Sequence, residues 1–212
     1  MFLNLHTHFP VNPSFEILNA TRTELQNQYF SAGIHPQNST NYQQKILQIE
    51  ISGKKPGCLA IGEIGLDKLI SVPFPDQMAA FEAQIDISEK LQLPVILHCV
   101  KAWNETVVTR KKLNPKQQWI FHGFRKISLL KNILDEGLMI SIGTAALHDK
   151  KLQAVVAKIP DDRLFLETDN DPEHTIEEVY LKVAELKGIS VERLIEIIYG
   201  NFTGTFLGWK VV

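Results

Sequence analysis

Two histidines near the start of the chain, His6 and His8, stand one residue apart at the end of the apolar stretch FLNLH. If this stretch is a β-strand, both imidazole rings point to the same side, as two ligands of one metal ion must. The pair alone is weak support for a metal site, because histidine is common both inside proteins and on their surfaces.

Four further potential ligands strengthen the argument, because each ends another apolar stretch: Glu63, His98, His122 and Asp169. Glu63 lies in the segment GEIGLD, where burying an uncompensated carboxylate is costly, so it is either solvated at a turn or neutralised by a cation. Four histidines and two carboxylates at corresponding strand ends can bind two divalent cations, and Glu63 can bridge them. The placement of all six residues at strand ends favours neutralisation of Glu63 by a cation over a solvated turn.

The apolar stretches number eight, as in a (β/α)8 barrel of the TIM type, whose active site lies at the carboxyl ends of the strands. They cover residues 2–6, 15–20, 29–34, 58–63, 94–99, 118–123, 138–143 and 164–169. Helical patterns cover 39–52, 76–92, 102–113, 125–136, 149–158, 174–187 and 190–199, the last opened by a Ser190 cap.

The first two connections between strands are too short for full helices. PVNPS (10–14) cannot form one, and TRTELQNQ (21–28) allows barely two turns after a capping box of Thr21 and Glu24. We therefore expect a shortened barrel with the first one or two outer helices missing or rudimentary. No linker or repeat divides residues 1–212, which we expect to form a single domain.

The bulk composition limits the possible partners. A formal charge of −2 gives no strong field, so binding of DNA would have to depend on local basic residues or metal ions. The two cysteines, Cys58 and Cys99, show no disulfide or metal-binding spacing. The sequence has no transmembrane stretch or signal peptide pattern, and we expect a cytoplasmic protein.

The ordered motifs HTH (6–8), GIHP (33–36), GEIGLD (62–67), LPVILH (93–98), FHGF (121–124) and LETDNDP (166–172), followed by NFTGTF, resemble those of the TatD family of metal-dependent deoxyribonucleases in the amidohydrolase superfamily. The resemblance covers most of the chain. It implies a (β/α)8 barrel whose metal ligands are His6, His8, Glu63, His98, His122 and Asp169, with Glu63 as the bridge. It also implies hydrolysis of DNA phosphodiester bonds, often from the 3′ end, with Mg²⁺ or a similar cation.

The ligand set suggests a mechanism. A metal held by His6, His8, Glu63 and Asp169 would convert bound water into hydroxide, with Asp169 taking the proton. A second metal, held by Glu63, His98 and His122, would stabilise charge on the phosphoryl oxygens. The mixed ligands suit Mg²⁺, Mn²⁺ or Zn²⁺.

Four residues are candidates for binding the substrate. His35, in GIHP, is the expected phosphate contact, although a histidine in such a turn can also be an ordinary loop residue. Lys101, Arg125 and Lys126 are the basic residues nearest the expected site, and each can equally be a solvated surface residue. Glu167 is expected to contact the metal ligands and orient them without binding the metal itself. Trp103, His148 and His174 have weaker claims, since packing or a helix entry explains each.

Departures from the TatD pattern concern the substrate and leave the ligands intact. Gln37 stands where a second histidine is usual, CVKA (99–102) lacks the usual arginine, and Arg125 and Lys126 replace a Ser/Thr-Gly pair. A deoxyribonuclease acting on single strands or 3′ ends is the leading interpretation. The alternatives are a metal-dependent amidohydrolase or lactonase for a small molecule, and a non-catalytic binding protein with a vestigial site.

The C-terminal segment NFTGTFLGWKVV is apolar and follows a barrel that is already complete. Such a segment seldom stays in water. We expect Phe202, Phe206 and Trp209 to pack against the sector near the first two strands, or a second copy of the chain to cover that sector in a homodimer.

Overall fold

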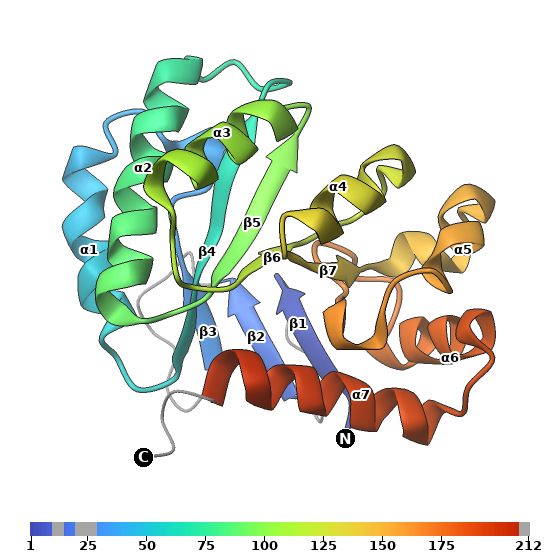
Figure 1. Cartoon of the computed structure of the whole chain (residues 1–212). Helices are drawn as coiled ribbons and strands as arrows, with labels where there is room; N and C mark the ends of the chain where they lie inside the picture. Colours follow the sequence, from blue (N-terminus) through green and yellow to red (C-terminus); the bar gives the residue numbers. More distant parts are fainter. Residues whose placement is uncertain (10–14, 20–28, 208–212) are drawn as a thin grey trace. The chain divides into compact units, whose positions relative to one another are not determined.

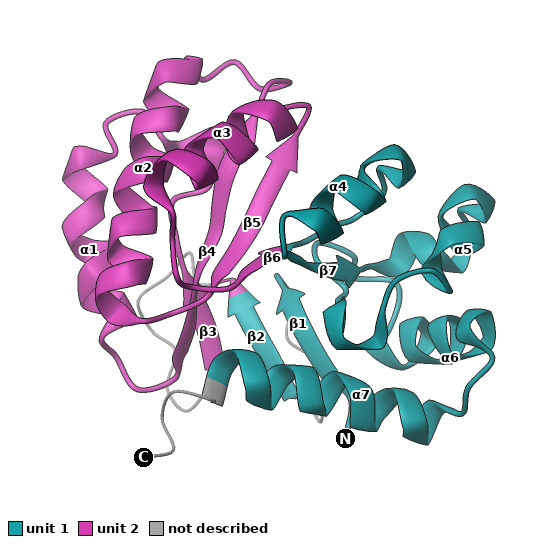
Figure 2. Cartoon of the chain, in the orientation of Figure 1, with its two compact units in different colours: residues 1–18, 121–212 teal, residues 19–120 magenta. Residues whose placement is uncertain are grey.

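The structure is a computed structural model that describes residues 1–9, 15–19 and 29–207 (Figure 1). The chain divides into two compact units, coloured separately in Figure 2: residues 1–18 with 121–212, and residues 19–120. The divisions fall within the strands β2 (Phe15–Asn19) and β6 (Trp119–Phe121). Parts of two predictions, the connections at 10–14 and 21–28 with their Thr21–Glu24 capping box, lie outside the described residues, as does Trp209.

The second unit, residues 19–120, contains three neighbouring parallel strands. They are β3 (Tyr29–Ala32), β4 (Cys58–Asp67) and β5 (Val95–Val100). Its helices are α1 (Gln43–Gly53), α2 (Phe74–Leu91) and α3 (Trp103–Leu113), with a 3-10 turn at Pro36–Asn38. Every residue of β4 is buried, which explains the almost continuous apolar character of its sequence.

Strand β4 is longer than predicted, because it continues through GEIGLD to Asp67 rather than ending at Glu63. The pairing with β5 shifts by one residue between Gly62 and Ile64, so Glu63 is an extra residue in β4. Such a bulge re-aims a side chain without ending the strand. A Cβ on Gly65, whose φ is +145°, would lie 1.9 Å from the His98 carbonyl oxygen, so only glycine fits against β5 there.

The first unit, residues 1–18 and 121–212, contributes β1 (Leu3–Thr7), β7 (Met139–Ile142), β8 (Leu164–Leu166) and most of β2. Parallel pairing joins β7 to β8 and β1 to β2, and an isolated parallel bridge joins Thr7 of β1 to Asp169, which follows β8. Its helices are α4 (Leu130–Asp135), α5 (Lys150–Val156), α6 (Ile176–Lys187) and α7 (Val191–Phe202). Short turns of other helix types cover Ile127–Leu129, Thr144–Leu147, Asp161–Arg163 and Thr203–Leu207.

Helix signals in the sequence are confirmed at α7, where the Ser190 side chain accepts a hydrogen bond from the Arg193 N–H. The predicted helix at 125–136 instead begins later. The Phe124 N–H donates to the Ser141 carbonyl at 3.1 Å, and the buried Phe124 side chain holds the chain beside β7. Helical turns therefore start only at Ile127.

The C-terminal segment packs within the first unit. Phe202 and Phe206 are both buried, and their ring centroids lie 4.9 Å apart. The Phe202 ring meets Phe15 of β2 at 5.1 Å, and the Phe206 ring meets Phe165 of β8 at 5.9 Å. The predicted contact of this segment with β2 is thus confirmed for Phe202. Within the described ranges, no helix has the length and apolar character needed to cross a membrane.

Candidate metal centre

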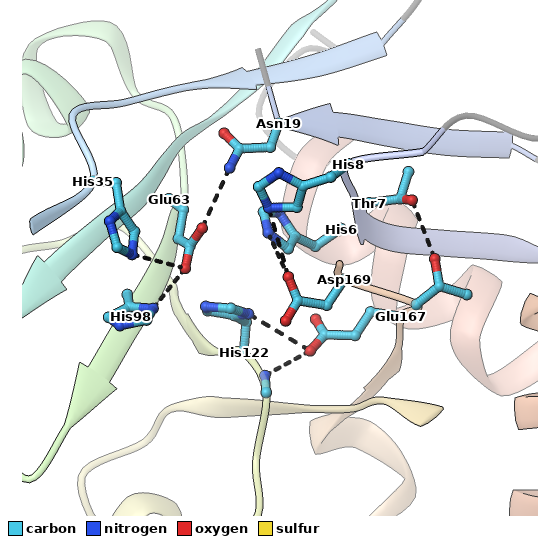
Figure 3. Close-up of polar contacts among 12 residues, drawn as sticks. His6, Thr7, His8, Asn19, His35, Glu63, His98, His122, Glu167 and Asp169 are labelled. Atoms are coloured by element: carbon cyan, nitrogen blue, oxygen red, sulfur yellow. Dashed lines mark hydrogen bonds and ion pairs between the residues drawn. The ribbon is translucent and has the colours of Figure 1, made fainter. Parts of the chain in front are cut away.

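In the first unit, His6, His8 and Asp169 form a triad whose side chains point toward one another (Figure 3). The Nε2 atoms of His6 and His8 lie 3.5 and 3.6 Å from Asp169 Oδ1. One ligand atom from each residue lies within 4.8 Å of the other two. His6 is fully buried, whereas His8 and Asp169 are partly exposed, so the triad has one face accessible to solvent.

Backbone pairing between β1 and the segment that follows β8 brings this triad together. Strand β8 ends at Leu166, so it is shorter than the predicted strand at 164–169. The His8 N–H donates to the Asp169 carbonyl at 3.0 Å, and the Asp169 N–H donates to the His6 carbonyl at 2.9 Å. Side chains reinforce the pairing, since Asn4 exchanges hydrogen bonds with Thr168. Asp169 has a φ of +53°, a conformation that aspartate tolerates better than most residues and that is frequent at functional sites.

His122 and Glu167 lie beside this triad in the same unit. The His122 and His6 rings are 4.8 Å apart between centroids. His122 Nδ1 lies 3.6 Å from Glu167 Oε1, which also accepts a hydrogen bond from the Gly123 N–H at 2.6 Å (Figure 3). Glu167 is completely buried, and this contact with a predicted ligand is what its predicted supporting role requires.

In the second unit, Glu63 is surrounded by His35, His98 and Asn19 (Figure 3). Glu63 Oε1 lies 2.6 Å from His98 Nδ1 and 3.6 Å from His35 Nε2, and Asn19 Nδ2 donates to Glu63 Oε2 at 3.3 Å. Only 5% of Glu63 is exposed. The solvated alternative is therefore wrong. A buried carboxylate facing imidazole nitrogens has the donor chemistry that a divalent cation requires.

His35 and His98 differ in what they can do. His35 Nδ1 accepts a hydrogen bond from the Gln37 N–H at 3.1 Å, so in the neutral ring the proton is on Nε2, the atom facing Glu63. A nitrogen that carries a proton cannot coordinate a metal. Although the spacing of His35, Glu63 and His98 alone would permit a metal triad, the hydrogen bond makes His35 a donor, in keeping with its predicted phosphate contact.

The predicted basic residues lie in exposed turns. Lys101 follows β5 with a φ of +52°, and Arg125 and Lys126 follow β6. The described contacts of the two groups of ligands do not include these three side chains. Their role in binding substrate stays a prediction.

The weaker candidates have ordinary structural positions. Trp103 is half-buried at the first residue of α3, and His148 is exposed. His174 Nδ1 lies 2.9 Å from Asp171 Oδ2, and this hydrogen bond raises the pKa of His174. Burial acts to raise the pKa of Asp171, but hydrogen bonds from Thr144, from the Glu173 N–H and from His174 outweigh it and lower that pKa to about 2.

Sequence reasoning missed Asn19 and Asp67. Asn19 ends β2 and contacts Glu63, so the rule that selected polar residues at strand ends could have found it. Asp67 ends β4, and its Oδ2 atom lies 3.5 Å from His98 Nε2. Its position in GEIGLD was visible, but its partner depends on the length of β4.

Imidazole and carboxylate side chains lie at the carboxyl ends of parallel strands, which is where barrels of the TIM type have their active sites. The model of the family described as TatD related DNase matches residues 6–207. The chain belongs to this family of metal-dependent hydrolases, as the motifs predicted.

Two curated relatives show the extent of the similarity. The chain is 35% identical over 147 residues to a protein of Erwinia tasmaniensis named 3′-5′ ssDNA/RNA exonuclease TatD, covering 66% of this chain and 56% of that protein. It is 27% identical over 165 residues to a Haemophilus influenzae protein named uncharacterized metal-dependent hydrolase, covering 73% and 63%. The chain thus spans less than two thirds of the length of these relatives.

A solved structure establishes the fold. The crystal structure of YJJV, a TatD homologue from Escherichia coli K12, matches with a TM-score of 0.79 at 21% identity, covering 97% of this chain and 98% of that chain. The predicted (β/α)8 fold is confirmed by this likeness and by the eight parallel strands.

Proposed function

We propose that this protein is a divalent-metal-dependent hydrolase that cleaves DNA phosphodiester bonds, most readily at the 3′ ends of single strands. The triad of His6, His8 and Asp169, with both Nε2 atoms directed at one carboxylate oxygen, carries the proposal. Membership of the TatD family supports the reaction, and the name of the Erwinia relative supports the preference for single strands.

We assign two divalent cations, Mg²⁺, Mn²⁺ or Zn²⁺, to the six predicted ligands. His6, His8 and Asp169 would hold one, His98 and His122 would belong to the other, and Glu63 would serve both. The donor set fits such ions, because three of its members, His6, Glu63 and His122, are almost completely buried polar groups. When bound, these ions lower the pKa of a coordinated water and offset the charge of the phosphoryl oxygens.

The side chains of the protein would supply the remaining steps. Asp169 accepts the proton of the attacking water as the general base. His35 donates its Nε2–H to a phosphoryl oxygen, which is the tautomer that the hydrogen bond from Gln37 selects. Lys101, Arg125 and Lys126 attract the DNA backbone without reading its sequence.

The experiment begins with protein stripped of metal and reloaded with one cation at a time. The substrates are a single-stranded oligodeoxynucleotide labelled at its 5′ end, its duplex, and a panel of amides and lactones. We expect a ladder shortened from the 3′ end, only with cation and faster on the single strand. Hydrolysis of an amide or lactone without cleavage of DNA would favour the amidohydrolase alternative. Cleavage that persists without any cation would overturn the proposal.

A pair of variants shows whether the triad is responsible. His8→Ala removes a triad member, whereas His148→Ala removes an exposed histidine outside both groups of ligands. We expect the first to lose cation-dependent cleavage and the second to retain it. Equal activity in the two variants would reject the assignment of the triad. If the parent protein binds DNA but does not cleave it, the result would favour the alternative of a non-catalytic binding protein with a vestigial site.

We also propose that residues 1–212 act as one domain in the cytoplasm. Neither Cys58 nor Cys99 forms a disulfide, which supports a reducing compartment. The homodimer, in which a second copy of the chain would cover the sector near the first two strands, is the alternative to packing of the C-terminal segment. Light scattering coupled to size-exclusion chromatography tests it, and a monomer at all concentrations would reject it.

A further inference from the structure

Asp67, at the end of β4, is a buried carboxylate without a role in the proposed reaction. It is 8% exposed, and its Oδ2 atom lies 3.5 Å from His98 Nε2. The other ring nitrogen of His98, Nδ1, lies 2.6 Å from Glu63 Oε1. The imidazole of His98 is therefore placed between two carboxylates, one at each nitrogen.

Several hydrogen bonds hold Asp67 in this position. Its Oδ1 atom accepts from the Leu69 N–H at 2.7 Å. Its backbone N–H donates to Gln77 Oε1 at 2.8 Å, and its carbonyl accepts from Gln77 Nε2 at 3.0 Å. Gln77 is 1% exposed. Asp67 thus uses Oδ1 to accept a hydrogen bond in the turn, while its Oδ2 atom faces His98.

We propose that Asp67 is a positioning residue that accepts a hydrogen bond from His98 Nε2–H and so reserves Nδ1 for a metal ion. A neutral imidazole carries one proton, and an ionised carboxylate can only accept it. Without a cation, the 2.6 Å contact between Nδ1 and Glu63 Oε1 requires a proton between these two atoms. If a cation is bound by Nδ1 and Glu63, the ring proton would instead be on Nε2, facing Asp67. This inference rests on the proposed function, because it requires His98 to be a metal ligand.

Carboxylates placed behind metal-binding histidines fix the ring orientation and raise the basicity of the coordinating nitrogen, and their loss typically weakens metal binding by about 10- to 100-fold. Asp67→Asn is the informative substitution. The asparagine Oδ1 atom can still accept from the Leu69 N–H, so the turn is retained. Its amide group would now face His98 as a donor and favour the tautomer with the proton on Nδ1, which blocks the metal.

The experiment compares the parent protein, Asp67→Asn and Gln77→Met, which disturbs the same turn but leaves the Asp67 carboxylate. Calorimetric titration of each metal-stripped protein with Zn²⁺ gives the affinity. Nitrogen NMR of the Zn²⁺-loaded parent, labelled in its histidine rings, shows which nitrogen of His98 carries the proton. We expect Asp67→Asn to bind Zn²⁺ about 10- to 100-fold more weakly, Gln77→Met to bind nearly as the parent does, and the His98 proton to be on Nε2.

The outcomes separate this inference from the proposed function. If the parent protein binds no cation, the proposed function is wrong and the role of Asp67 is rejected with it. If the parent binds Zn²⁺ and Asp67→Asn binds it equally well, or if the His98 proton is on Nδ1, only the role of Asp67 is overturned. Equal weakening in both variants would reveal a purely structural effect of the turn and would likewise reject it.

Discussion

Removing the ring of Phe202 should destabilise the protein more than any surface change on the same helix. Phe202 is 4% exposed, and its ring lies 5.1 Å from Phe15 and 4.9 Å from Phe206. Replacing a buried phenylalanine with alanine typically costs about 3 to 5 kcal/mol, which includes the cavity that remains. The loss of two aromatic contacts places the expected value for Phe202→Ala in the upper half of that range.

The assay is urea denaturation followed by circular dichroism, with Tyr199→Ala as the matched control. Tyr199 is on α7 as well, but 62% of it is exposed, so its loss should change the free energy of unfolding by no more than about 0.5 kcal/mol. If Phe202→Ala unfolds at the same urea concentration as Tyr199→Ala, the C-terminal aromatic residues do not stabilise the first unit and the reasoning is refuted.

Three further predictions concern the reaction, the strand packing and the surface charges. Asp169→Asn should lower kcat by about 10²- to 10⁴-fold with little change in DNA affinity; a loss confined to affinity would show that Asp169 is no general base. Gly65→Ala should prevent folding, because its Cβ would lie 1.9 Å from a carbonyl oxygen of β5; a normal melting temperature would refute this. Hydrogen bonds from Lys54 and Lys90 lower the pKa of Glu50 from 4.5 to about 2. Because that pKa is lowered on folding, its stabilising effect is present above pH 4.5 and is lost as the pH falls toward 2. Glu50→Gln should therefore lose less stability than the parent between these pH values, and identical pH profiles would refute it.

The strands and the residues that gather in the candidate metal centre could be predicted from the sequence because both depend on local patterns. Runs such as LPVILH are apolar without interruption, as strands buried on both faces are, and polar residues that end such runs are conspicuous. Glu63 was selected for this reason, and the structure places it beside His98.

What the sequence could not predict depends on contacts between distant segments. The continuation of β4 to Asp67 requires the bulge at Glu63 and the close approach of Gly65 to β5. The segment GEIGLD contains two glycines, a composition that locally indicates a turn. The tautomer of His35 depends on a hydrogen bond from the Gln37 N–H. Gln37 is near in sequence, but its N–H faces the His35 ring only because a 3-10 helix forms at Pro36–Asn38. The contact between Asp67 and His98 joins two strands, so it cannot be predicted from either segment alone.

Metal analysis of the parent protein and of Glu63→Gln tests the central claim most directly, with Glu82→Gln as the control. Glu82 accepts a surface hydrogen bond from Lys112 and is not one of the six predicted metal ligands. We predict about two divalent cations per chain and cation-dependent DNA cleavage in the parent and in Glu82→Gln. Glu63→Gln should fold, bind metal more weakly and show no turnover. Unchanged metal content and full activity in Glu63→Gln would contradict the account of a metal centre built around Glu63.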